Sequence, residues 1–163
     1  MKKSILTLLA IIAIAISAQA QEISKNAIGL RLGDSDGFGT EVNYQRALGD
    51  NNRLELGLGW RSRRNFDAIK IAGLYQWVWN IDGGFNWYAG VGATLGSFSY
   101  DDDFFDDDDR SDFFVNAAGT VGIEYNFDFP LLISLDVRPE IGILNDFRDD
   151  LDLDIALGIR YQF

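Results

Sequence analysis

The sequence predicts an all-β chain that folds into an eight-stranded antiparallel up-and-down β-barrel, and three observations support this fold class. After residue 20, apolar and polar residues alternate with period two in eight separate segments. Short groups of Gly, Asp and Asn separate most of these segments, as expected for tight turns. The chain has 17 glycines, two prolines and no cysteine, so an exported form must be held by packing or by a closed hydrogen-bonded sheet.

Residues 1–20 have the pattern of a cleaved signal peptide. Two lysines precede an apolar run over residues 5–16, and the sequence AQA at 18–20 is a small-x-small cleavage site. A run this short is poor as a membrane-spanning helix, which needs about 20 residues. We therefore expect an exported protein in which residues 21–163 form one domain.

The composition after this cleavage excludes several classes of protein. Without Lys2 and Lys3 the chain keeps 12 of its 14 basic residues and all 25 acidic ones, which gives a formal charge of −13. No basic stripe is present that would neutralise phosphates, so we expect no nucleic-acid partner. We also expect no cofactor.

The eight alternating segments can be placed along the chain in order. They cover residues 26–33, 38–48, 53–61, 69–80, 85–96, 113–125, 131–138 and 151–163. Links 49–52, 82–84 and 127–130 are tight, whereas 99–111 is long and acidic. Pro139 cannot donate to a sheet ladder, so we expect a bulge or a strand edge there.

Alternation alone does not say whether the apolar face points inward, as in a soluble sandwich or lipocalin-like barrel, or outward toward lipid. The polar face is rich in glycine and in charges of both signs, and aromatic residues gather near segment ends. The tight links alternate with the more variable ones, and the segments are long enough to cross a bilayer in about 9–11 tilted residues. Together these features favour a transmembrane β-barrel.

In such a barrel the polar face lines the lumen. An eight-stranded lumen is only wide enough to be filled by side chains, and charges buried there must be paired. We therefore predict a plugging charge network made of Arg31, Glu41, Arg53, Glu55, Lys70, Glu124, Asp136, Arg138, Glu140, Asp152, Asp154 and Arg160.

The last segment carries a family resemblance. The chain ends in IALGIRYQF, with apolar or aromatic residues at alternate positions up to a final phenylalanine. With the signal peptide and the eight segments, this ending resembles small bacterial outer-membrane β-barrels of the OmpX/OmpA type. The resemblance implies a porin-like barrel in the outer membrane of a Gram-negative bacterium, in contact with its lipid, with both termini periplasmic. It also implies an assembly signal, read by the barrel-assembly machinery, at Leu157, Ile159, Tyr161 and Phe163.

The residue types argue against catalysis. The chain has no histidine and no cysteine, so its serines lack the commonest activating base. Asp152 and Asp154 lie on one face and would suit acid–base chemistry, but we expect them to be lumen charges paired with Arg138 or Arg160. We therefore predict that the protein is not an enzyme.

The long acidic link is the other candidate site. Carboxylates are the ligands that Ca²⁺ prefers, although the link lacks the glycine and the closing glutamate of an EF-hand. The simpler interpretation is a solvated, self-repelling surface loop, with divalent cations as possible partners. The carboxylates concerned are Asp101, Asp102, Asp103, Asp106, Asp107, Asp108 and Asp109.

The sequence thus predicts an integral outer-membrane barrel with a structural, envelope-integrity or surface-interaction role. A narrow pore for small solutes is one alternative. A soluble periplasmic, lipocalin-like ligand-binding barrel is the other. The resemblance implies a cellular location and a fold, but it does not imply one particular activity.

Overall fold

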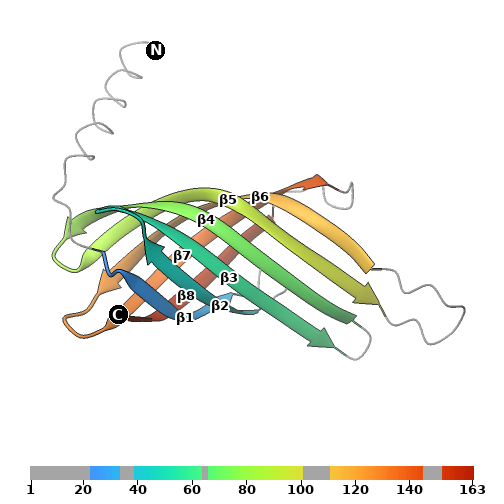
Figure 1. The fold of residues 1–163 in the computed structure, drawn as a ribbon, viewed down its shortest axis with the longest axis horizontal. Coiled ribbons are helices and arrows are strands. Elements are labelled where there is room, and N and C mark those ends of the chain that lie inside the picture. Colours follow the sequence, from blue (N-terminus) through green and yellow to red (C-terminus); the bar gives the residue numbers. More distant parts are fainter. Residues whose placement is uncertain (1–22, 34–38, 64–65, 101–110, 145–151) are drawn as a thin grey trace, which may run out of the picture.

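The computed structural model describes residues 23–33, 39–63, 66–100, 111–144 and 152–163, which form a closed antiparallel barrel (Figure 1). Each strand pairs with its neighbour in the sequence, and the first strand pairs with the last, so no sheet edge remains free. No helix in the described ranges is long and apolar enough to cross a membrane. The strands are β1 (Asn26–Gly33), β2 (Thr40–Ala47), β3 (Asn52–Arg63), β4 (Phe66–Asp82), β5 (Phe85–Tyr100), β6 (Ser111–Asn126), β7 (Leu131–Leu144) and β8 (Asp152–Gln162).

All eight predicted segments are strands, but their lengths differ from those predicted. The β1 and β2 strands have 8 residues each, whereas β4, β5 and β6 have 16 or 17. We call the end with the tight turns 48–51, 83–84 and 127–130 the turn end, and the opposite end the loop end. Residue 23 and Phe163 both lie at the turn end, and the long strands project at the loop end (Figure 1).

The prediction of a bulge or strand edge at Pro139 is wrong. Strand β7 continues through Pro139 to Leu144, and Pro139 pairs in register with Leu153 of β8. On the other side, the register with β6 is the same before and after the proline, although residues 119–120 and 138–139 are not paired. The missing N–H therefore interrupts one ladder locally, while the other ladder keeps the strand in place. The register shift lies instead at Val115/Asn116.

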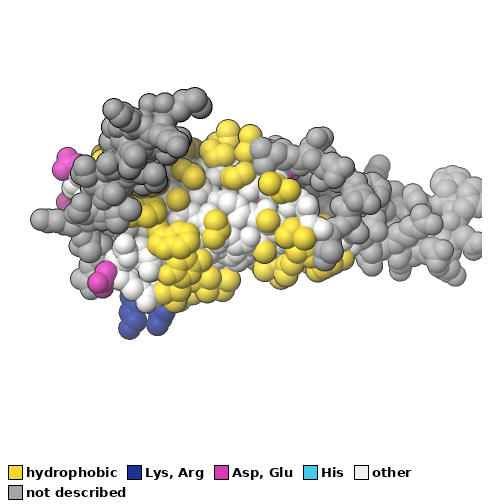
Figure 2. All heavy atoms as spheres, turned by 90° about the horizontal axis from the view of Figure 1, so that it is seen from above, with side chains coloured by type: hydrophobic (Ala, Val, Ile, Leu, Met, Phe, Trp, Pro, Cys, Tyr) yellow, Lys and Arg dark blue, Asp and Glu magenta, His cyan; other side chains and the backbone are white. Residues whose placement is uncertain are grey.

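The apolar side of each strand faces outward, and the polar side faces the interior. In β8, Asp154, Ala156, Gly158 and Arg160 are buried, whereas the residues between them are exposed. The same alternation runs around the barrel, and Figure 2 shows hydrophobic side chains spread over the outer surface. This is the reverse of the pattern in a soluble barrel, and it matches a barrel with lipid outside.

Aromatic side chains gather at the turn end of the outer surface. Trp79 of β4 stacks on Trp87 of β5 with ring centroids 4.3 Å apart. Tyr125 of β6 contacts Phe85 at 4.6 Å and Phe127 at 4.7 Å. Such rings favour the boundary between lipid and water, so they mark one edge of the apolar band.

A small apolar group closes the interior at the turn end. Ile23, which precedes β1, packs with the inward-facing side chains of Val78 and Tyr88, and Ala47 lies beside them. The backbone carbonyl of Lys25 accepts a hydrogen bond from the N–H of Ala47, which holds this segment against β2. The alternation pattern gave no indication of this group, because residue 23 precedes the first alternating segment.

Candidate functional site

Within the described ranges, the interior of the barrel holds eleven buried charged side chains, five basic and six acidic. Each of the eleven forms an ion pair with a group of opposite charge within 4.0 Å. Complete pairing of this kind is what allows charges to be buried without a large net penalty. The eleven are Arg31, Glu41, Arg53, Glu55, Lys70, Glu124, Asp136, Arg138, Glu140, Asp154 and Arg160.

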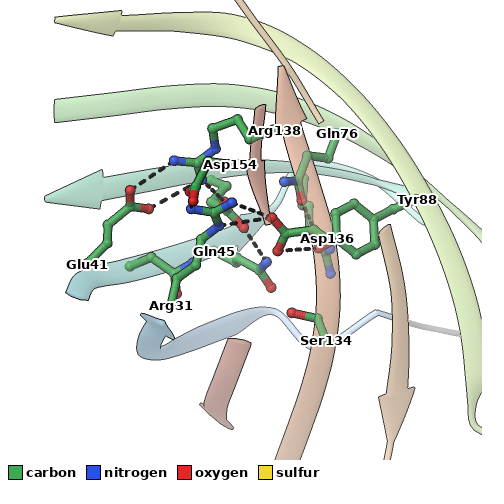
Figure 3. A network of polar contacts seen from close by, with 12 residues as sticks. Arg31, Glu41, Gln45, Gln76, Tyr88, Ser134, Asp136, Arg138 and Asp154 are labelled. Carbon is green, nitrogen blue, oxygen red and sulfur yellow. Dashed lines mark hydrogen bonds and ion pairs between the residues drawn. The ribbon is translucent and has the colours of Figure 1, made fainter. Parts of the chain in front are cut away.

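Arg138 bridges the lumen from β7 to the opposite wall. Its Nη1 lies 2.8 Å from Oε2 of Glu41 on β2, and its Nη2 lies 3.1 Å from Oε1 of Glu55 on β3. Figure 3 shows Arg138 and Glu41 facing each other across this space. Because the partners come from strands that are not neighbours, the pair braces the two sides of the barrel against each other.

Arg31 holds two carboxylates in the same region. Its Nη2 lies 2.6 Å from Oδ1 of Asp136, and its Nη1 donates to Oδ2 of Asp154 (Figure 3). The other oxygen of Asp136 accepts a hydrogen bond from the Tyr88 hydroxyl at 3.1 Å. Asp154 was expected to pair with Arg138 or Arg160, and this is wrong. Arg31 is its partner because β1 lies beside β8 in the closed barrel.

Glu55 collects donors from three sides. Besides the hydrogen bond from Arg138, Glu55 accepts hydrogen bonds from Arg160 Nη2 at 3.3 Å and from Gln45 Nε2 at 2.6 Å. Arg160 in turn donates to Oδ1 of Asn43 at 2.9 Å and to Oγ of Ser134 at 2.6 Å. Neutral polar side chains therefore supply part of the hydrogen bonding of the central charges. Among the described residues, Arg138 Nε, Asp154 Oδ1 and Asn43 Nδ2 are buried without a hydrogen-bond partner.

Two further ion pairs lie toward the two ends of the lumen. Near the turn end, Arg53 pairs with Glu124 at 2.8 Å and donates to Gln76 at 2.6 Å. Near the loop end, Lys70 pairs with Glu140 at 2.5 Å. Thr94 and Asn116 donate to the second oxygen of Glu140, at 2.8 Å and 3.0 Å.

Glycines leave the room that this network occupies. A Cβ on Gly57 would lie 2.2 Å from Oε1 of Glu41, and one on Gly158 would lie 2.3 Å from Oγ of Ser134. No side chain fits at either position without displacing a member of the network. The small residues expected on the lumen face are therefore there to make space for long charged side chains, which fill the interior.

The remaining predicted sites are only partly described. Asp152, the twelfth predicted lumen charge, is half-buried and pairs in register with Glu140. The acidic residues 101–110 lie outside the described residues, so a divalent cation there stays a prediction. Within the described ranges, no group of three or more His, Cys, Asp or Glu side chains is placed to hold a metal ion.

The prediction of the network was incomplete because it considered charged residues only. Neutral polar side chains that share the inward positions take part equally, and the parity of their positions would have identified them. They are Asn43, Gln45, Gln76, Asn86, Tyr88, Thr94, Asn116 and Ser134.

Comparison with known proteins gives matches at the level of structure. No protein-family model matches the chain, and no curated protein matches it. The N-terminal β-barrel domain of Pseudomonas aeruginosa OprF superposes with a TM-score of 0.65 at 14% identity, covering 89% of this chain and all of that domain.

Two further structures are similar. Ail, the attachment invasion locus protein of Yersinia pestis, has a TM-score of 0.58 at 16% identity, and the match covers 86% of this chain and 97% of Ail. A de novo designed transmembrane β-barrel has a TM-score of 0.57 at 15% identity, covering 89% of this chain and all of the designed one. The chain therefore has the fold of the small eight-stranded outer-membrane β-barrels of bacteria.

Proposed function

We propose that this protein is an integral outer-membrane β-barrel with a structural, envelope-integrity or surface-interaction role and no catalytic activity. The observation that carries the proposal is the reversed distribution of side chains, apolar outside and charged inside. In water this arrangement would expose a broad apolar belt while burying eleven charged side chains that water would solvate. In a bilayer both faces are matched to their surroundings.

The orientation that we propose follows from the two ends of the barrel. Residues 1–20 would be removed as a signal peptide on export, which leaves residues 21–163 as the barrel domain. The turn end, with its short connections and the start of β1, would then face the periplasm. The connections at the loop end would face outside, and a surface-interaction role would reside there.

The lack of catalysis and of a wide channel is also part of the proposal. The sequence has no histidine or cysteine, and the buried carboxylates are each engaged by a basic side chain. Most of the ion pairs join strands that are not neighbours, so long side chains occupy the path that a solute would take. These features support a plugged barrel over a pore.

We also propose that the outward residues of β8 guide insertion by the barrel-assembly machinery. Leu157, Ile159, Tyr161 and Phe163 all point outward and are exposed. The test is cell fractionation of an F163A/Y161A variant, with the inward Q162A as the matched control. Outer-membrane yield should fall for the double variant and stay unchanged for Q162A. Equal yields would contradict this role.

The proposed function itself is tested by membrane fractionation together with heat-modifiable gel migration. We expect the protein in the outer-membrane fraction, and a folded barrel that migrates faster before boiling than after it. Recovery with the soluble periplasmic fraction would support the lipocalin-like alternative instead. Large, stable conductance in single-channel recordings would overturn the plugged lumen and support a pore.

A further inference from the structure

The turn end carries an isolated basic site on an otherwise acidic rim. Among the side chains that the structure describes, Lys25 and Arg46 are the two basic ones that are exposed, and all the others are buried in the lumen. Their backbones are adjacent, because Asn26 pairs with Arg46 and the N–H of Ala47 donates to the backbone carbonyl of Lys25. Figure 2 shows the Lys and Arg side chains visible on this face gathered at one end of the barrel.

The side chain of Arg46 is held in place by hydrogen bonds. Its Nη1 donates to Oδ1 of Asn26 at 2.7 Å, and the hydroxyl of Tyr44 donates to the same oxygen at 2.8 Å. Asn26 is itself fixed to the end of β8, since its backbone N–H and its side-chain Nδ2 both donate to the main-chain oxygen of Phe163. The guanidinium is thus positioned before any ligand arrives, which lowers the entropic cost of binding.

No side chain that the structure describes neutralises the charge of this pair. Neither Lys25 nor Arg46 forms an ion pair with any carboxylate in the described part of the chain. The acidic residues of the turn end, Asp50, Asp82 and Asp128, lie in or beside the turns and are exposed. A guanidinium with free N–H groups matches the geometry of a phosphate oxygen pair.

An apolar row lies directly next to this charged row. Ile28 of β1 pairs with Tyr44 of β2 on one side and with Tyr161 of β8 on the other. These three outward side chains are two residues further into the strands than Arg46, Asn26 and Phe163, or about 7 Å along the strand. The rim thus carries positive charge, and an aromatic and aliphatic row follows it. A phospholipid has its groups in the matching order, with the charged phosphate first and the apolar acyl chains after it.

We infer that Lys25 and Arg46 form a binding site for the phosphate of an anionic glycerophospholipid in the periplasmic leaflet, with its acyl chains along the row Tyr44, Ile28 and Tyr161. This inference rests on the proposed orientation of the barrel, in which the turn end faces the periplasm. An anionic headgroup is favoured over a zwitterionic one, because a second positive charge at Lys25 would repel an ammonium group. The acidic protein as a whole repels anionic lipid, so any selectivity must come from this site.

The inference is tested by native mass spectrometry of the full mature protein refolded in detergent micelles. Phosphatidylglycerol and phosphatidylcholine with the same acyl chains are the two probes, and the readout is lipid retained per barrel. We expect preferential retention of phosphatidylglycerol by the unaltered protein. Neutralising a basic side chain near a lipid surface should weaken that retention by about fivefold, so K25Q/R46Q should lose most of it.

Three further measurements make the outcome decisive. Gln at position 46 keeps a donor for Asn26, and heat-modifiable migration checks that K25Q/R46Q is folded. If it is not folded, R46K is used, which keeps the charge but not the planar guanidinium and should retain less phosphatidylglycerol than the unaltered protein.

D50N/D82N is the matched control and should retain at least as much phosphatidylglycerol as the unaltered protein. Equal retention of the two lipids, or unchanged retention in folded K25Q/R46Q, would overturn the site. Either result leaves the proposed membrane location intact, because only recovery in the soluble fraction contradicts that.

Discussion

Trp87 and Tyr88 are adjacent in β5, yet they show how different the two surfaces of this barrel are. Trp87 points outward and stacks on Trp79, and its contribution to stability comes from apolar area and ring contact. Tyr88 points inward, is completely buried, donates to Asp136 and lies 4.7 Å beneath the guanidinium of Arg53. One step along a strand thus exchanges a lipid-facing environment for one that is dominated by paired charges.

The comparison shows where the two surfaces should be sensitive to substitution. On the outer surface, one apolar residue can replace another, because lipid adapts to either. On the inner surface, each charge depends on a partner from another strand, so the removal of one side chain leaves a buried charge behind. A charge placed outside should be harmful for the same physical reason that an unpaired charge inside is harmful.

The largest effect is expected from R138M. This change removes the only ion-pair partner of Glu41 within the described residues, whereas Glu55 keeps Arg160 and Gln45. A buried carboxylate without a partner should cost about 3–5 kcal/mol of unfolding free energy. Urea unfolding in lipid vesicles, followed by tryptophan fluorescence, measures it. R138M/E41Q should recover a large part of the loss, and a double variant no more stable than R138M would contradict the explanation.

The next largest effect is expected from L58R on the outer surface. Leu58 is exposed near the middle of the apolar band, where it pairs with Val42 and Ile71. A lipid-facing arginine near the midplane of a bilayer costs about 2–4 kcal/mol. The control is F129R in the β6–β7 turn, where the same charge should cost about 0–1 kcal/mol. Equal losses in the same unfolding assay would show that depth in the membrane is not the cause.

Alternation predicted the two surfaces, but it did not predict the partners inside. Eleven of the twelve predicted lumen charges are buried and Asp152 is half-buried, since one strand step reverses the side chain. The ion pairs join residues that are far apart in sequence, such as Arg31 and Asp136, separated by 105 positions, and Arg138 and Glu41, separated by 97. Which charges meet across the lumen depends on the stagger of the closed barrel, and a strand pattern does not contain that quantity.

The lengths of the strands could not be predicted from the sequence pattern either. Strand β7 passes through Pro139 because pairing with β8 compensates for the ladder bond that the proline cannot make. Gly119 of β6 leaves space for the proline ring, since a Cβ there would lie 3.3 Å from its Cγ. The cost of a proline in a strand is thus decided by its neighbours across the sheet.

A smaller effect is expected from Y88F. The change keeps the ring beneath Arg53 but removes the hydrogen bond to Asp136, which still has Arg31 as its partner. A hydrogen bond to a charged group is worth about 1.5–3 kcal/mol, and the retained ion pair should keep the loss near the lower end. Urea unfolding measures it. A loss as large as that of R138M would mean that the hydroxyl, and not the ion pair, holds Asp136.

The smallest effect is expected at the same height on the outer surface, between Trp79 and Trp87. Their offset-stacked rings, with planes 19° apart, should contribute about 0.5–1.5 kcal/mol beyond the area that each buries. A double-mutant cycle of W79L, W87L and the double variant isolates this coupling, because leucine keeps the lipid contact and removes the stacking. The matching cycle of Y88F with D136N should give a coupling at least as large. If the tryptophans coupled more strongly than the buried pair, ring contacts at the membrane edge would stabilise this barrel more than the hydrogen bonds of its lumen, and the outer surface would be the less tolerant of the two.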